Sequence, residues 1–417
     1  MDVNLQTSIG PVRPSQRFHI IDILRGFAIF GILLVNMEFF NNSFYAMVIG
    51  EYDINSTLDQ IGRWFIAFFG EGKFYSTFSF LFGLGMALQY ARAQEKGQRF
   101  VLFYLRRMFV LFLIGLVHAY LFWVGDILIL YSVLGTVLLI FFRNRKPKTL
   151  LIWTAIFLIV PILLNAALLG FLSVGRMSPG GDAMMDEVFS EQMRTMTAAD
   201  AKADLVYATG TFAEITQQRI EDMVYVFTTW PFMGFNVFAM FVLGLYAGKQ
   251  KLYENSSENL TTWRKVWIWG LIIGVIGNFV YVVFSEGANR SMPSPQLLIS
   301  LIGQTFGAPA LALFYMTSLA LLFQRPEWRP RLMPLSFVGR MALTNYLLQT
   351  LISTTLFYGY GFGLYGKIGI AGGVLLTVVI YAIQIPFSKW WLSRFRFGPM
   401  EWLWRSATYL KLQPMKR

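Results

Sequence analysis

The chain has 417 residues, of which 56% are hydrophobic and only 14% are charged. A soluble domain carries about 25% charged residues, so this composition excludes an ordinary soluble protein. The apolar residues form long continuous runs, which predict membrane-spanning helices and argue against a β-barrel. The net charge of +12 falls mainly in alternate connections between these runs. We therefore attribute it to membrane topology and expect no nucleic-acid partner.

Residues that bind metals or form disulfides are scarce. The sequence has no cysteine and two histidines, His19 and His118. This excludes a disulfide, a thiolate nucleophile, an iron–sulfur cluster and a histidine-rich metal site. We expect no metal and no permanently bound cofactor.

The predicted domain organisation is simple. Residues 1–17 are polar and lack the apolar core of a signal peptide, so we expect a cytoplasmic tail. A transmembrane domain, residues 18–393, then contains about ten helical spans. The spans cover Ile20–Phe40, Phe74–Ala93, Phe103–Val124, Ile127–Phe142, Leu150–Leu172, Val224–Gly248, Val266–Ser285, Leu297–Phe323, Met341–Tyr360 and Ile368–Leu392. The stretch Leu58–Gly70 is too short to span, and is either an interfacial helix or part of a longer second span.

The connections predict the orientation. Lysine and arginine gather in one alternating set of them, including residues 92–107, 143–148 and 394–417. The positive-inside rule places this set and both termini in the cytoplasm. Between the fifth and sixth spans, residues 173–223 form a long acidic segment that we predict to be helical and extracytoplasmic. A connection this long is typical of a lid or binding element, and the alternative is a solvated cap with no role in chemistry.

The segment Arg106–Phe142 is the strongest candidate for chemistry. His118 lies within its first apolar run, and Asp126 lies where that run joins the second. Ionisable groups at membrane depth are costly and commonly functional. On an unbroken helix the two residues would be about 12 Å apart, but a turn at Gly125 would bring them closer.

An imidazole suits general-base work near neutral pH, and a carboxylate beside it would fix its tautomer. The second run, Ile127–Phe142, is only about 24 Å of helix, shorter than the membrane core. We therefore expect the join to lie at the floor of a polar cavity. The alternative is that His118 is a packing residue bonded to a neighbouring helix.

Other candidates lie at the two ends of the spans. Asn36 could orient a carbonyl or stabilise an oxyanion, or simply bond a helix end. Arg25, Arg107 and Arg340 lie near cytoplasmic ends of spans. Arginines there could bind a polyphosphate, whereas the alternative is topology and contact with anionic lipids.

Five segments carry a family resemblance. They are Ile21–Ile32 with Val35-Asn36, Lys73–Gly83, His118 with Gly125–Tyr131, Gly339–Tyr346, and Gly398–Arg405. In this order they resemble the YeiB family, known as domain of unknown function 418. That family is more distantly similar to transmembrane acyltransferases, including the acyltransferase-3 proteins that O-acetylate cell-surface glycans and heparan-α-glucosaminide acetyltransferase.

The feature shared with the acyltransferases is the opening helix D-x-x-R-G-[IF]-A, here Asp22, Arg25, Gly26 and Ala28. In the glucosaminide enzyme an asparagine follows this motif, and Asn36 matches it. A histidine also follows there, but Asn41–Gly50 contains none. On this resemblance His118 would have to act from another helix.

The resemblance implies an acyltransferase in a bacterial cytoplasmic membrane, in contact with lipids, and is compatible with a homodimer. Acyl-CoA would be a co-substrate docked near Arg25, Arg107 and Arg340. The acceptor would be a hydroxyl or amine of a glycan, lipid or small molecule. His118 would be the base, Asp126 would orient it, and Asn36 would hold the carbonyl.

Two other hypotheses stay open. One is a small-solute transporter or exporter in which His118 and Asp126 form a proton relay. The other is a lipid-binding or structural membrane protein with neither activity.

Overall fold

The computed structural model describes residues 18–50, 56–254, 257–285, 288 and 292–417, and these residues form helices without strands. The predicted tail of residues 1–17 lies outside them. The elements are α1 (His19–Asn41), α2 (Ala46–Ile49), α3 (Thr57–Phe65), the π-helix η2 (Ile66–Gly70), α4 (Lys73–Glu95), α5 (Phe100–Leu121), α6 (Leu128–Val137), the π-helix η3 (Leu138–Phe142), α7 (Pro147–Arg176), α8 (Gly181–Thr209), α9 (Phe212–Lys249), α10 (Ser257–Ser285), α11 (Pro295–Gln324), α12 (Arg329–Arg340), α13 (Ala342–Phe357), α14 (Ile370–Arg394) and α15 (Pro399–Tyr409). The predicted all-α class is confirmed.

Seven helices in the described part of the chain are long and apolar enough to cross a membrane: α1, α5, α7, α9, α10, α11 and α14. The chain is therefore a multi-pass membrane protein. The other three predicted spans are also helical, as α4, as α6 with η3, and as α13. Among these, α13 has only 16 residues and α4 carries several polar side chains. The count of ten crossings stays a prediction.

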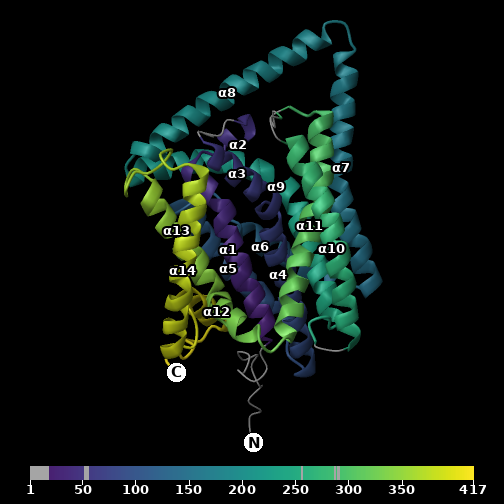
Figure 1. Ribbon diagram of the computed structural model, residues 1–417, viewed down its shortest axis with the longest axis vertical. Coiled ribbons are helices and arrows are strands. Elements are labelled where there is room, and N and C mark those ends of the chain that lie inside the picture. Colours follow the sequence, from purple (N-terminus) through teal and green to yellow (C-terminus); the bar gives the residue numbers. More distant parts are fainter. Residues whose placement is uncertain (1–17, 51–55, 255–256, 286–287, 289–291) are drawn as a thin grey trace, which may run out of the picture.

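The two ends of the helix bundle differ in character. One end of the bundle holds the start of α1 and the C-terminus (Figure 1). Arg107 belongs to this end through its contact with Trp404 of α15. Lys249 belongs to it through the end of α9, where Gly248 packs on Ala87 of α4. We call this end the basic end, and the opposite end the α8 end. Lys249 donates to the carbonyl of Arg145 over 2.7 Å, which joins the end of α9 to the η3–α7 turn.

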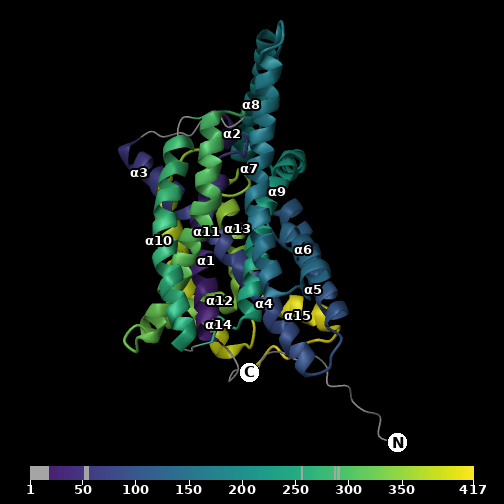
Figure 2. The same ribbon diagram turned by 90° about the vertical axis from the view of Figure 1, so that its right-hand side faces the viewer.

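The acidic segment forms a helical arm rather than a separate cap. α7 projects beyond the bundle, and α8 returns across the α8 end towards α13 (Figures 1 and 2). Thr211 and Glu214 form a capping box that starts α9. α9 then continues without a break into the bundle as far as Lys249. The predicted end of the acidic segment, at residue 223, therefore lies inside one long helix, α9.

α3, η2 and α4 form one interrupted rod that runs antiparallel to α1. A Cβ on Gly70 would lie 3.1 Å from Val35, and one on Gly31 would lie 2.1 Å from the Phe74 ring. Nearer the basic end, Ile21 and Leu24 of α1 share a core with Leu81 and Leu84 of α4. The rod is broken at Gly72, whose φ of +84° suits glycine. The break therefore lies beside the middle of α1, so Leu58–Gly70 leads into the second predicted span.

Close backbone contact fixes α1 against α12. A Cβ on Gly26 would lie 2.1 Å from the carbonyl oxygen of Leu335, and one on Gly339 would lie 1.8 Å from that of Asp22. Only glycine allows two helices to approach this closely. The contact places the region of Arg25 next to the end of α12, where Arg340 lies.

Glu401 of α15 holds the first turn of α13. Its carboxylate accepts from the backbone N–H groups of Leu343 and Thr344 at 2.7 and 3.1 Å, and from the Thr344 hydroxyl at 2.6 Å. These donors belong to the start of a helix, where N–H groups have no partner within the helix. A segment near the C-terminus therefore anchors the helix that carries Thr350.

We expect Glu401→Ala to lower the free energy of unfolding by about 1–3 kcal/mol, because buried donors lose their acceptor. Thermal melting in detergent measures this loss. The matched control is Glu327→Ala, since Glu327 is exposed at the same end. Equal melting temperatures for the two variants would show that Glu401 does not anchor α13.

Candidate active site

The turn after α5 brings His118 and Asp126 together. The N–H groups of Phe122 and Trp123 both bond to the carbonyl of His118, at 3.0 and 2.9 Å, and this reverses the chain. Gly115 makes room for the returning segment, because a Cβ there would lie 3.1 Å from Asp126 Oδ1. As a result, His118 Nδ1 lies 2.7 Å from Asp126 Oδ2. The eight-residue separation is closed by a turn, as the sequence suggested.

Both imidazole nitrogens have partners. Asp126 also accepts from the N–H of Ile129 at 2.8 Å, which fixes the carboxylate. On the other side of the ring, His118 Nε2 lies 3.0 Å from Thr350 Oγ1 of α13. A carboxylate can only accept, so in the neutral imidazole Nδ1 carries the proton and Nε2 accepts from the Thr350 hydroxyl. This is the tautomer that a general base requires.

The surroundings of His118 are aromatic and polar. The ring is 1% exposed and Asp126 is 2% exposed. Its neighbours include Tyr346 and Trp123, with ring centroids 5.2 and 6.5 Å away. The imidazole is therefore enclosed, and the aqueous cavity expected above it is not open in this state.

Several buried polar atoms in this region have no hydrogen-bond partner among the described residues. They include Trp123 Nε1, Tyr346 Oη, Gln349 Oε1 and Ser353 Oγ. Gln349 precedes Thr350, and Ser353 lies one helical turn after it. Buried polar groups are nearly always paired with protein or water. The region around His118 therefore has unused capacity to bind a polar group.

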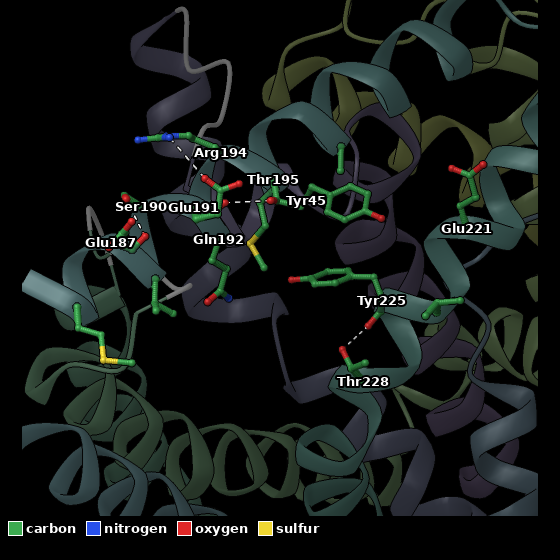
Figure 3. Close-up of a pocket in the computed structure, with 15 residues that line it drawn as sticks. Tyr45, Glu187, Ser190, Glu191, Gln192, Arg194, Thr195, Glu221, Tyr225 and Thr228 are labelled. Carbon is green, nitrogen blue, oxygen red and sulfur yellow. Dashed lines mark hydrogen bonds and ion pairs between the residues drawn. The ribbon is translucent and has the colours of Figure 1, made fainter. Parts of the chain in front are cut away.

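A cavity of about 1030 Å³ opens at the α8 end, and α8 and α9 provide most of its lining (Figure 3). Tyr45 and Tyr225 lie at its centre with ring centroids 4.9 Å apart. The carboxylates of Glu187 and Glu191 belong to α8. The arm thus forms one wall of a cavity, as a binding element would.

This cavity stops short of His118. Phe44, next to Tyr45, has its ring 6.2 Å from Trp123, and Trp123 packs towards the imidazole. Two aromatic side chains therefore lie between the cavity and the base. A second cavity of about 750 Å³ is lined mainly by apolar residues of α6, α7 and α9. Neither cavity is lined by His118 or Asp126.

Asn36 lies on α1 three residues after Leu33 and four before Phe40, near the same face of the helix. Phe40 packs on Trp123 with ring centroids 4.3 Å apart. Among the described residues, the hydrogen bonds of His118 and Asp126 go to other partners than Asn36. The structure therefore brings His118, Asp126 and Thr350 together but does not bring Asn36 into hydrogen-bond contact with them.

The predicted anion-binding arginines gather towards the basic end. Arg107 stacks over the Trp404 ring at 3.7 Å, and its carbonyl accepts from the Trp404 indole at 2.9 Å. Arg25 and Arg405 are near enough for their charges to act on Arg107. Arg25 is also paired with Asp22 at 3.3 Å. The structure therefore brings Arg25 and Arg107 into one positive region, beside the helix that ends at Arg340.

A buried ionic network surrounds the break in the interrupted rod. Arg63 lies 2.8 Å from Glu38 and 2.5 Å from Glu71, and Tyr281 donates to Glu71. Lys73, fully buried, donates to the carbonyl of Ala67 at 2.8 Å. No local pattern in the sequence indicates this network, because its members come from segments far apart in the chain.

The sequence alone does not identify Thr350 as a partner of His118. The available signal is the run of buried polar residues along α13. They are Thr344, Asn345, Gln349, Thr350, Ser353 and Thr354. Such residues on a helix that otherwise reads as a span indicate a polar interior face.

Comparison with known proteins places the chain in a family. Residues 247–411 match the family described as "Protein of unknown function (DUF418)". Residues 17–187 match "Heparan-alpha-glucosaminide N-acetyltransferase, catalytic". The second match covers α1, His118 and Asp126.

Full-length relatives agree with this. The chain is 37% identical to "Uncharacterized protein YxaH" of Bacillus subtilis (strain 168), over 99% of both chains. It is 30% identical to "Uncharacterized 39.9 kDa protein in amylase 3'region" of Bacillus acidopullulyticus, over 98% of both chains. It is 28% identical to "Uncharacterized protein YeiB" of Escherichia coli (strain K12), over 93% of this chain and 95% of that protein. The chain belongs to the DUF418 family, the YeiB family that its motifs indicated, and carries a region similar to membrane acyltransferases.

Proposed function

We propose that this protein is an acyltransferase of a bacterial cytoplasmic membrane, which moves an acyl group from acyl-CoA to a hydroxyl or amine. The observation that supports this most directly is the chain of hydrogen bonds from Asp126 through His118 to Thr350. It presents an imidazole whose unprotonated Nε2 can take the proton of a hydroxyl bonded to it, and a carboxylate that stabilises the imidazolium. The similarity of residues 17–187 to an acetyltransferase catalytic region supports the same reaction class.

The donor would bind from the basic end. Arg25, Arg107 and Arg340 offer guanidinium groups suited to the phosphates of CoA. Arg107 and His118 share α5 and are about 16 Å apart along its axis. The pantetheine arm would bridge that distance and bring the thioester to His118. On this assignment the basic end faces the cytoplasm, where acyl-CoA is available.

The acceptor would come from the α8 end. The cavity under α8 combines two tyrosine rings with carboxylates, a lining that suits a polar, hydroxyl-bearing or amine-bearing molecule. Phe44 and Trp123 would have to move for it to reach His118. Asn36, next to this route, would then hold the carbonyl.

The test is acyl transfer by purified protein from labelled acetyl-CoA and palmitoyl-CoA to a panel of glycans, lipids and amines. We expect Asp126→Asn to lower kcat by about 10²–10⁴-fold, because the amide no longer fixes the base tautomer. The KM for acyl-CoA should not change, since Asp126 is remote from the arginines. Asp182→Asn, at an exposed ion pair, is the control. An unchanged kcat in Asp126→Asn would remove the carboxylate from the mechanism.

A transporter is the second candidate, and the interrupted rod favours it. Broken helices with buried charges at mid-membrane are typical of substrate and ion sites in secondary transporters. Here the break at Gly72 is flanked by Glu71 and Lys73 and faces Arg63. Solute flux into proteoliposomes without release of CoA thiol would favour this reading over acyl transfer.

A further inference from the structure

We infer that Thr350 is a nucleophile that carries the acyl group as an ester on Oγ1 between acyl-CoA and the acceptor. This inference rests on the proposed acyltransferase function and adds a covalent intermediate to it. Thr350 Oγ1 lies 3.0 Å from His118 Nε2, while His118 Nδ1 lies 2.7 Å from Asp126. Hydroxyl, imidazole and carboxylate in this order are the arrangement that activates a nucleophile in hydrolases.

The Thr350 hydroxyl is directed differently from those of three other buried threonines in the bundle. Thr77, Thr154 and Thr377 donate to the carbonyl one turn earlier in their own helices, at 2.9, 2.9 and 3.0 Å. The corresponding contact of Thr350, to the Tyr346 carbonyl, is stretched to 3.4 Å. A bond this long is weak. The nearer partner of the Thr350 hydroxyl is therefore the imidazole that can take its proton.

Attack on a thioester also requires donors for the oxyanion that forms. The unpartnered buried groups include donors such as the indole N–H of Trp123 and the hydroxyl of Ser353. Ser353 lies one turn from Thr350 on the same helix, where residues three apart are neighbours. The Trp123 ring packs beside His118. Nucleophile, base and unused donors thus belong to one buried region.

The two half-reactions balance without a further reactant. In the first, Oγ1 attacks the thioester carbon and His118 Nε2 takes the hydroxyl proton. The carbon–sulfur bond breaks, and the sulfur leaves with that proton as free CoA. In the second, the acceptor hydroxyl or amine attacks the ester and gives its proton to His118. The bond to Oγ1 then breaks, and Thr350 regains the proton.

An acyl-enzyme predicts a reaction that needs no acceptor. Purified full-length protein is incubated with acetyl-CoA and radiolabelled CoA, and we expect the label to pass into acetyl-CoA. The exchange rate should fall by about 10²-fold or more in Thr350→Val and stay within about tenfold in Thr350→Ser. Thr377→Val is the control, because that buried hydroxyl bonds only to its own helix. Peptide mass spectrometry should find the acetyl group on Thr350, and thermal melting shows that each variant is folded.

The opposing outcomes separate this inference from the proposed function. Transfer to an acceptor at the wild-type rate in Thr350→Val, or transfer by the wild type without any CoA exchange, would mean that the acyl group passes directly. Thr350 would then only hydrogen-bond His118, and the acyltransferase assignment would stand. If folded wild-type protein neither exchanges CoA nor acylates any acceptor, from acetyl-CoA or from palmitoyl-CoA, both proposals are wrong.

Discussion

Replacing His118 by alanine is expected to lower the rate of acyl transfer by about 10²–10⁴-fold, the usual contribution of a general base. The imidazole is the candidate base in this buried site, and Asp126 holds it in the required tautomer. The KM for acyl-CoA should stay near the wild-type value, because the proposed phosphate ligands lie at the basic end.

The chain supplies a matched control for this experiment. His19 is the other histidine, and it is exposed at the start of α1. His19→Ala should transfer acyl groups at the wild-type rate. His118→Gln tests packing, since it keeps a polar side chain of similar length but cannot act as a base. Transfer that survives both His118 substitutions would remove the proposed base.

Removal of Arg63 is expected to have the largest effect on stability. Its guanidinium lies between Glu38 and Glu71, with side chains only 4% and 9% exposed. Breaking a buried ion pair by deleting one partner costs about 3–5 kcal/mol, because the remaining charge is left in a medium of low polarity. We therefore expect Arg63→Ala to lower the melting temperature strongly in detergent.

The control is Arg176→Ala, which removes an exposed pair with Asp182 and should change stability by less than about 1 kcal/mol. Adding Glu38→Gln and Glu71→Gln to Arg63→Ala should restore part of the loss, because the carboxylates are then neutral. A melting temperature of Arg63→Ala equal to that of Arg176→Ala would show that the network does not hold the interrupted rod.

The sequence was informative where one physical force dominates. Backbone groups in lipid must form their hydrogen bonds within the segment, which favours helices. The apolar runs therefore predicted the helices well. The pairing of His118 with Asp126 was also predictable in outline. Gly125 allowed a turn, and a charge in an apolar run needs a partner nearby in space.

What the sequence did not reveal depends on contacts between distant segments. Thr350 meets His118 from a helix 232 residues later, and a single threonine in a span carries no local signal of that contact. Glu38 of α1 is paired with Arg63 of α3, and hydropathy does not report an ion pair between two separate helices. The enclosure of His118 depends on how Trp123 and Tyr346 pack, which periodicity cannot specify.

The most direct test of the central claim is a cryo-EM structure of the protein with an unreactive thioether analogue of acetyl-CoA. The account predicts density for the phosphates against Arg25 and Arg107, with the thioether beside His118 and Thr350. The side chain of Trp123 or Phe44 should be displaced, so that the cavity at the α8 end connects to His118. An analogue that binds elsewhere, or a His118 ring that stays enclosed while saturating analogue is present, would contradict it.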